Sequence, residues 1–445
     1  MTQVVDRPIG TDLYLAAFDR ARREGAGAPA WLAPIRDAAI ARFGAVGFPT
    51  SRDEEWRFTS VAPIAERAFQ LAADGAARVS EADLAPALFG APGANRLVFV
   101  NGRHAAGLSI AGQWPAGVVV TDLGAAIAAD PARLEPHLTR LAGLRDRPFV
   151  ALNTALFDAG ALVLVPDHVV VEEPVHLLFV STAPDAPTVS YPRVLVVAGA
   201  NSQVRLVESY AGVGDGASFA NAVTEITLGE NAVVDHYKVQ RETPRGYHVG
   251  SLHVRLARNA NLSSHSIALG AALARNDVEV VLDGEGGECT LNGLYLVDGR
   301  RLVDNHTTID HAQPHCDSHE VYKGILSGQA QGVFNGKIIV RPDAQKTDAK
   351  QTNRALLLSD NAQINTKPQL EIFADDVKCT HGAAVGQLDD DAIFYLRSRG
   401  LDVDQARTLL IEAFAGDILG RIRVAPLRER LEAEMLRQLP GGAAR

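Results

Sequence analysis

The chain has 445 residues, of which 47% are hydrophobic and 22% charged, so it can form two or three globular domains. Its formal net charge of -10 argues against nucleic acid as the main partner, because phosphate binding needs a concentrated excess of Lys and Arg. The low cysteine count of three argues against a disulfide scaffold and favours a reducing compartment. The N-terminus lacks the apolar core of a signal peptide and no segment has the length of a membrane span, so we expect a cytoplasmic protein.

The first part of the chain is predicted to be mainly helical. Residues 10–90 are rich in Ala, Leu and Arg, with Gly and Pro as breaks. A strand, RLVFV, is predicted from Arg96, and a helix-like stretch covers roughly residues 121–142. We therefore predict an N-terminal helical and mixed domain over residues 1–147.

From about Pro148 an apolar strand, a small polar turn and a second strand recur along the chain. Aligned on Asn201, Asn231, Asn259 and Gly286, the turns repeat at intervals of 30, 28 and 27 residues, and Asn361 is taken as a later copy. Asn and Gly suit such turns because they tolerate left-handed backbone angles. A repeat of this length is too small to bury its own face, so the copies must stack. This predicts a mainly β fold with a β-helix core over residues 148–387.

Helical periodicity returns after Leu388, which predicts a C-terminal helical domain over residues 388–445. Asp402 and Gln405 have the spacing of a capping box, and Pro426 suits the first turn of a last helix. An apolar stripe follows, formed by Leu410, Phe414, Leu427, Leu431, Met435 and Leu439. The stripe can pack on the chain's own β-helix or receive another protein, and the pattern leaves both open.

Familiar catalytic motifs are missing. There is no phosphate loop, no strand-GxGxxG-helix unit, no GxSxG elbow and no HExxH helix, so a conventional enzyme has little support.

The stretch 305–320 concentrates metal-ligating side chains, namely His306, His311, His315, Cys316 and His319. Their spacing matches no closed zinc site, and strand alternation would send neighbours to opposite faces. A structural or interface role is favoured. The alternative is a stand-alone β-helix metalloenzyme that uses His311, His315 and His319 for hydrolysis or oxidation.

A second pair, Cys379 and His381, is separated by one residue and would share one face of a strand. These two donors are half of a four-ligand iron or zinc site. The pair is either such a half-site, completed by another chain, or a small buried thiol beside a histidine that caps the last strand.

Five ordered stretches of the chain resemble the SufB/SufD family of scaffold proteins for iron–sulfur cluster assembly. They are DEEWRFT (53–59), ALNTALFDAGALVLVP (151–166), VDNHTTIDHAQPHCDSHEVYKGIL (303–326), QTNRALLLSDNAQINTKPQLEIFADDVKCTHGA (351–383) and AVGQLDDDAIFYLRSRGL (384–401). Two positions resemble the SufD branch: Asn353 stands where SufB chains carry a cysteine, and Thr380–Ala383 replaces their Gly-His-Glu-Ala run.

The resemblance implies a central right-handed parallel β-helix between helical domains, in a non-catalytic scaffold that pairs with SufB. It also implies that the C-terminal helices dock SufC, an ATP-binding-cassette ATPase that would carry the nucleotide site. By resemblance, His381 belongs to a cluster-assembly site at the SufB interface, where SufB supplies the key cysteine. Cys379 matches a neighbouring family cysteine. The expected cluster is transient, with none held by the isolated chain, which could form a homodimer when SufB is absent.

Overall fold

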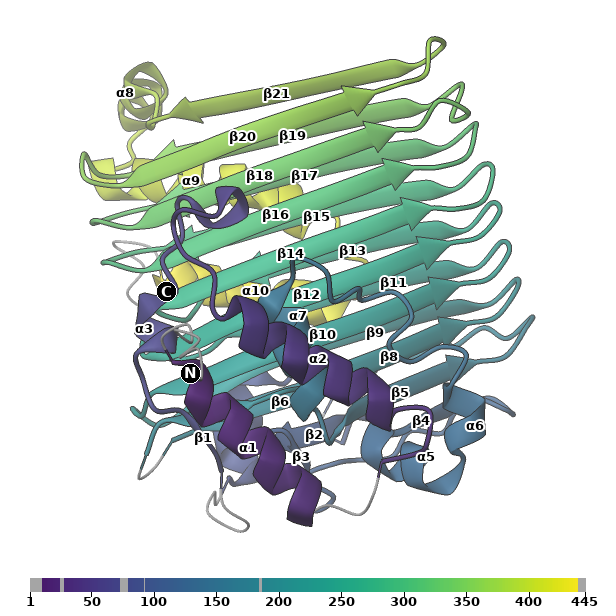
Figure 1. The fold of residues 1–445 in the computed structure, drawn as a ribbon. Helices are drawn as coiled ribbons and strands as arrows, with labels where there is room; N and C mark the ends of the chain where they lie inside the picture. Colours follow the sequence, from purple (N-terminus) through teal and green to yellow (C-terminus); the bar gives the residue numbers. More distant parts are fainter. Residues whose placement is uncertain (1–9, 25–27, 73–78, 92, 184–185, 439–445) are drawn as a thin grey trace, which may run out of the picture.

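The computed structural model describes residues 10–24, 28–72, 79–91, 93–183 and 186–438. Its centre is a β-helix in which each turn adds one strand to each of two sheets (Figure 1). The strands of this β-helix, in chain order, are β5 (Gly160–Val165), β6 (Val175–Thr182), β7 (Thr188–Ser190), β8 (Arg193–Ala198), β9 (Gln203–Val213), β10 (Ser218–Leu228), β11 (Val233–Arg241), β12 (Gly246–Leu256), β13 (Asn261–Ala268), β14 (Leu273–Leu282), β15 (Glu288–Val297), β16 (Leu302–His311), β17 (Asp317–Leu326), β18 (Gln331–Val340), β19 (Asp348–Leu357), β20 (Gln363–Ile372) and β21 (Lys378–Gly386).

Alternate strands pair in parallel, which confirms the predicted β-helix. One sheet runs β20-β18-β16-β14-β12-β10-β8-β5 and the other runs β21-β19-β17-β15-β13-β11-β9-β6. The register places Val233 beside Gln203 and Asn261, and Asn261 beside Glu288, as the predicted intervals require. Each strand turns alternate side chains inward, and the inward Val, Leu and Ile residues of successive turns form one continuous core.

The corner residues confirm most of the repeat and correct its last step. Asn201, Asn231, Asn259 and Gly286 all have positive φ angles, between 53° and 72°. The next residues with positive φ at this corner are His315 (59°) and Lys346 (65°). Asn361 lies instead between β19 and β20, at the opposite corner, so its alignment with the other turns is wrong. The error arose because the turns were aligned on Asn and Gly, and the corners at His315 and Lys346 have other residues at these positions.

The N-terminal region covers one end and one face of the β-helix (Figure 1). Its elements are α1 (Thr11–Glu24), α2 (Ala33–Val46), η1 (Glu54–Trp56), α3 (Ala62–Ala65), β1 (Gln70–Leu71), α4 (Glu81–Leu84), η2 (Ala85–Ala87), β2 (Leu97–Val100), β3 (Arg103–His104), β4 (Val119–Asp122), α5 (Leu123–Ala129), α6 (Pro131–Leu134) and α7 (Pro148–Leu156). β2 pairs in parallel with β6, and β4 pairs antiparallel with β5. The two sheets therefore begin before residue 148, while the predicted domain limits stay a prediction.

The C-terminal helices are α8 (Asp390–Ser398), α9 (Val403–Leu419) and α10 (Ala425–Gln438). The predicted capping box is present: the Asp402 carboxylate accepts from the Gln405 backbone N–H, and the Gln405 side chain accepts from that of Asp402. In the described part of the chain, no helix has the length and apolar character needed to cross a membrane.

The apolar stripe of these helices is mostly buried in the chain's own core. Leu427, Leu431 and Met435 are at most 4% exposed and pack with side chains of the β-helix. Of the two alternatives, the structure favours packing on the chain's own β-helix, and this face is not free to receive a partner. Leu439, the last member of the predicted stripe, lies outside the described residues.

Candidate functional site

The two ends of the β-helix differ. The first strands continue into β2 and β4, whereas β20 and β21 are the last strands of their sheets and have one neighbour each among the described strands (Figure 1). Every residue of β20 and β21 is at least partly exposed, unlike the buried strands of the preceding turns. A terminal strand presents unpaired N–H and C=O groups that can accept another strand. We call this region, β20 and β21, the open end.

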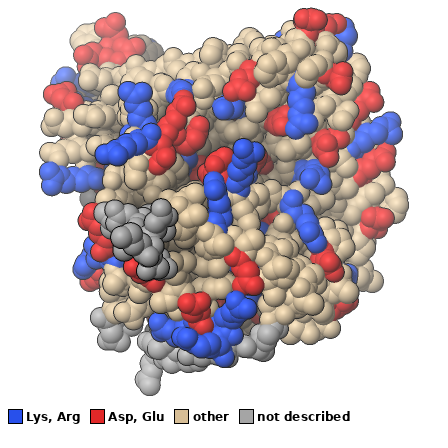
Figure 2. Space-filling view, in the orientation of Figure 1, with Lys and Arg blue, Asp and Glu red and all other residues tan. Residues whose placement is uncertain are grey.

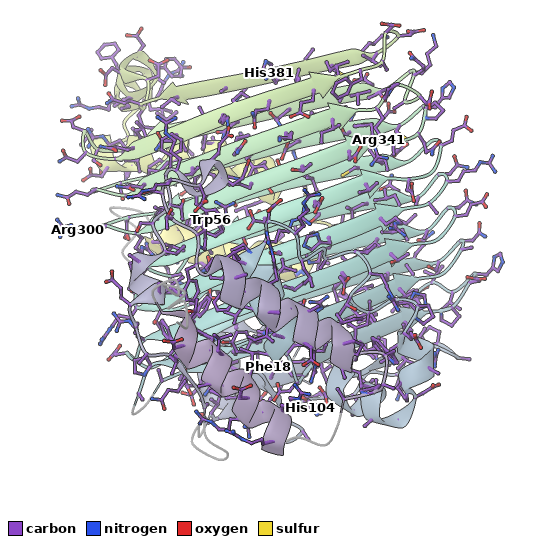
Figure 3. The ribbon with its side chains drawn as sticks, in the orientation of Figure 1. Phe18, Trp56, His104, Arg300, Arg341 and His381 are labelled. Carbon is purple, nitrogen blue, oxygen red and sulfur yellow. The ribbon has the colours of Figure 1, made fainter. Side chains whose placement is uncertain are left out.

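Cys379 and His381 both lie on β21 at the open end. Figure 3 labels His381 on this strand. In register, Cys379 lies beside Ala349 and His381 beside Gln351, both buried residues of β19. The half-buried Cys379 packs against the interior cluster that contains Ala349, and His381, two residues later, faces the same side. The structure therefore brings the predicted pair together, with His381 exposed.

The two side chains differ as ligands. Partial burial raises the pKa of the Cys379 thiol, which disfavours the thiolate that binds metal. An exposed imidazole needs no such activation. On this comparison His381 is the more accessible donor of the two.

Exposed apolar side chains surround the open end. Phe373 follows β20, Val385 lies on β21, and Phe394 and Tyr395 lie on α8, with exposed fractions between 50% and 74%. Large apolar groups with this exposure are typical of surfaces that another protein covers. Phe373 lies at the corner between β20 and β21, one strand length from α8, so we call only Val385, Phe394 and Tyr395 the end patch.

Directly below His381, the interior is polar. Glu320 on β17 is paired in register with Gln351, which is in turn paired with His381. The Gln351 side-chain Nε2 donates to the Glu320 carboxylate over 2.7 Å. Burial raises the pKa of Glu320 to about 7, although hydrogen bonds from Thr307 and Gln351 act in the opposite direction. Sequence reasoning missed Glu320. The only signal for it was its position in the strand, since it is two residues from both Ser318 and Tyr322, whose side chains point inward.

The histidines of residues 305–320 do not form one site. His311 is fully buried inside the β-helix, with Nε2 2.9 Å from the Ser318 hydroxyl. His315 is exposed at a corner, and His319 is exposed on the outer face of β17. Strand alternation separates them, so the suggestion that these three act together as metal ligands is not supported. Within the described ranges, no three His, Cys, Asp or Glu side chains are arranged to hold a metal ion.

The stretch DEEWRFT crosses the outer face of the sheet that contains β14, β16, β18 and β20, and we call residues 53–59 the strap. Lys367 on β20 donates to Glu54 over 2.6 Å. His306 on β16 lies 3.1 Å from Glu55, and Asn335 on β18 also donates to this carboxylate. These contacts explain the charged start of the motif.

The second half of the strap is held by buried charges. The guanidinium of Arg275 lies 3.9 Å from the ring centroid of Trp56, and the hydroxyl of Thr59 donates to Asp304. Although burial favours its protonated form, Arg275 and His306 lower the pKa of Asp304 to about 2. Burial alone would lower the pKa of His306, but Asp304 and Glu55 raise it to about 9. His306 is thus cationic at neutral pH and locks the strap to the sheet.

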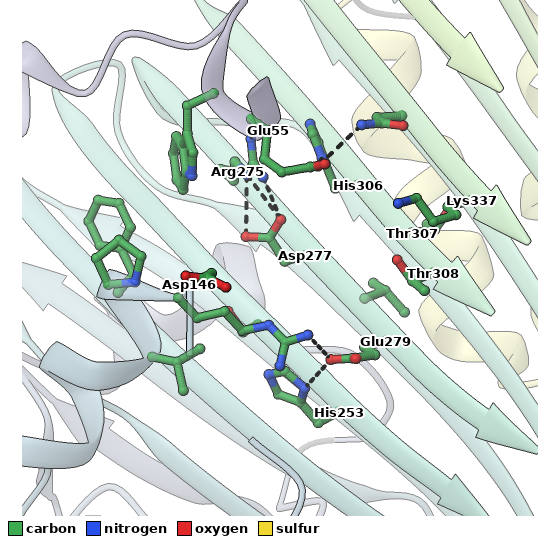
Figure 4. Close-up of a pocket in the computed structure, with 18 of the residues that line it drawn as sticks. Glu55, Asp146, His253, Arg275, Asp277, Glu279, His306, Thr307, Thr308 and Lys337 are labelled. Atoms are coloured by element: carbon green, nitrogen blue, oxygen red, sulfur yellow. Dashed lines mark hydrogen bonds and ion pairs between the residues drawn. The ribbon is translucent and has the colours of Figure 1, made fainter. Parts of the chain in front are cut away.

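A pocket of about 320 Å³ lies between the strap and residues 145–150, with strands β12, β14, β16 and β18 as its floor (Figure 4). Figure 2 shows acidic and basic side chains close together around the hollow on this face. Its charges are paired with one another: Glu279, for example, binds both Arg147 and His253. A charged ligand would have to break these pairs, so we assign no role to the pocket.

Two family models match consecutive parts of the chain. The SufBD protein N-terminal region matches residues 11–177, and the SufBD core domain of SUF system FeS cluster assembly matches residues 179–414. The chain is similar to an iron–sulfur cluster assembly SufBD family protein of Synechocystis, with 37% identity over 89% of this chain and 88% of that protein. It is also similar to the iron–sulfur cluster assembly proteins SufD of Escherichia coli (32% identity, 89% of this chain and 90% of that protein) and Bacillus subtilis (27%, 96% and 97%).

Proposed function

Because the chain belongs to the SufB/SufD family of iron–sulfur cluster assembly proteins, we propose that it is a SufD-type scaffold subunit that pairs with SufB and docks SufC. The observation that carries the proposal is the open end, where an exposed His381 lies on the terminal strand β21, which also carries Val385 of the end patch. An end of this kind suits a second β-helix, whose last turn would cover it.

In this proposal the cluster is cargo, built transiently between the two chains. Iron accepts imidazole and thiolate ligands, and a cluster normally needs about four protein donors. This chain offers His381, with Cys379 as a weaker second donor, so the remaining donors must come from SufB. The isolated chain would then hold no stable cluster. It would also have no catalytic role of its own, and ATP hydrolysis would take place on SufC in the cytoplasm.

SufC docking is assigned to the outward face of the C-terminal helices. Leu427, Leu431 and Met435 are buried, and Phe394 and Tyr395 belong to the end patch. Of the other exposed apolar residues on these helices, Leu409 on α9 is the most exposed, at 43%, and it marks the proposed docking face. Movement of SufC during its ATP cycle would reach the open end through α8, which follows β21 after a short connection.

The proposal is tested by anaerobic co-expression with SufB and SufC homologues, followed by counting of subunits, iron and sulfide. We expect a complex of all three proteins, and we expect His381→Ala to keep the complex but reduce its iron and sulfide. Cys379→Ser should have a smaller effect. The matched control is His319→Ala, which removes an exposed histidine from β17. A complex that retains full cluster content with His381→Ala would exclude this residue as a ligand.

The alternative, a stand-alone metalloenzyme, predicts stoichiometric metal and turnover in the isolated chain. We expect His315→Ala and His319→Ala to leave the metal content of the isolated chain unchanged, as measured by elemental analysis. Near-stoichiometric zinc or iron in the wild type that is lost in these variants would favour the enzyme.

A further inference from the structure

Three inward-facing polar residues lie one above another at the open end. Glu320, Gln351 and His381 occupy matching positions on β17, β19 and β21, which are successive strands of one sheet. Adjacent strands are about 4.8 Å apart, so each side chain lies within reach of the next. Glu320 and Gln351 are at most 2% exposed, whereas His381 is exposed.

The amide of Gln351 has a defined orientation. The Nε2 of Gln351 donates to Glu320 over 2.7 Å, and this orientation is required whenever Glu320 is ionised, because a carboxylate only accepts hydrogen bonds. The amide oxygen is left buried and without a hydrogen-bond partner among the described residues. A buried acceptor without a partner is costly and needs an explanation.

The opposite sheet leaves room for this amide. A Cβ atom added at Gly336 on β18 would lie 2.3 Å from Nε2 of Gln351. Only glycine at this position lets the Gln351 side chain extend across the interior and stay beside Glu320. The polar pair is therefore accommodated by the packing around it.

We propose that Gln351, held by Glu320, is the positioning residue for His381: its amide oxygen accepts a hydrogen bond from one ring nitrogen and leaves the other nitrogen free to bind iron. Histidines that bind metal generally donate their second ring N–H to a carboxylate or carbonyl, which fixes the tautomer and the ring orientation. The inference deepens the proposed function, since it rests on His381 acting as a ligand.

The test is the tautomer of His381 in the full chain, without iron or partners. Nitrogen-15 NMR of the histidine side chains at pH about 8.5, where an ordinary imidazole is neutral, distinguishes the protonated from the bare ring nitrogen. We expect one tautomer to predominate in the wild type. Gln351→Leu should change the tautomer ratio about fivefold, as expected for loss of one ordinary hydrogen bond. His381→Asn assigns the signal.

The matched control is Asn353→Leu, which removes another buried amide of β19 that lies beside Ala383 rather than His381. It should leave the tautomer unchanged even if it lowers the melting temperature. If Gln351→Leu fails to fold, the double variant Glu320→Gln with Gln351→Glu replaces it as the test. This exchange keeps the volumes of both side chains and still offers a hydrogen-bond acceptor to His381. We expect this exchange to retain the predominant tautomer.

An unchanged His381 tautomer in folded Gln351→Leu, or a mixture of tautomers in the folded exchange variant, would overturn the inference. Neither result depends on cluster assembly. Failure of the proposed function, seen as full cluster content with His381→Ala, is therefore distinguished from failure of the positioning role.

Discussion

At the residue scale, burial of single charged groups makes stability depend on pH, and Glu320 is the clearest case. Its pKa of about 7 lies above the ordinary value of 4.5, so the folded state binds the proton more tightly than the unfolded chain. Stability should therefore fall as pH rises from about 4.5 to 7 and stay lower above that range. Glu320→Gln should remove this fall and raise the free energy of unfolding at pH about 8 by up to about 3 kcal/mol.

Urea denaturation of both proteins at a series of pH values measures this effect. The control is Glu285→Gln, which changes an exposed carboxylate at a corner of the β-helix. Equal pH profiles for wild type and Glu320→Gln would show that the buried carboxylate does not titrate near neutrality.

His306 has a pH dependence of the same direction, but in a higher pH range. Its folded-state pKa is raised to about 9 by Asp304 and Glu55, against the effect of burial. The strap should gain its full stabilisation below the ordinary histidine pKa of about 6.5 and lose it as pH rises through about 9. His306→Gln should cost about 1–3 kcal/mol at pH about 7, as expected for a lost partly buried ion pair. The same substitution should also abolish the drop in melting temperature that the wild type shows between pH about 8 and 10. Circular dichroism measures the melting temperature of both proteins.

At the element scale, strands and helices could be predicted from the sequence where one face of the element is apolar. The recurring strand-turn-strand unit predicted the β-helix, and the capping box at Asp402 marked the start of α9. The corner at His315 was missed because the turns were aligned on Asn and Gly, and this corner has His at the residue with positive φ. The contacts of the strap were equally hidden: Glu55 and His306 are 251 residues apart, and only the folded sheet brings them together.

The C-terminal helices lead to a prediction about docking. Leu409→Ser should weaken capture of a SufC homologue by at least about tenfold, since central apolar contacts dominate interfaces. The melting temperature should hardly change, because this side chain is exposed. Leu436→Ser, at 37% exposure on α10, is the control and should bind normally. Deletion of residues 388–445 is a poorer test, since it would uncover the β-helix surface that Leu427 and Leu431 protect.

At the scale of the whole molecule, the open end distinguishes this chain from a closed β-helix. One end is covered by the N-terminal elements, while the other carries His381, free strand edges and the end patch (Figures 1 and 3). A stacked β-helix whose last turn lacks a polar cap tends to associate, because that turn has no neighbour to bury its face. The isolated chain should therefore form a homodimer through the open end, and SufB should compete with this pairing.

Val385→Lys is the sharpest test of such pairing. Val385 lies on β21 and is 50% exposed, so lysine fits the folded monomer, but its charge would be buried when a second strand covers the edge. We expect sedimentation velocity to show a wild-type dimer and a Val385→Lys monomer with an unchanged melting temperature. The same variant should fail to bind SufB. His381→Ala, on the same strand, should leave both associations intact because it adds no charge. If Val385→Lys still pairs with SufB and with itself, the open end is not the interface, and the site at His381 would have to be completed elsewhere.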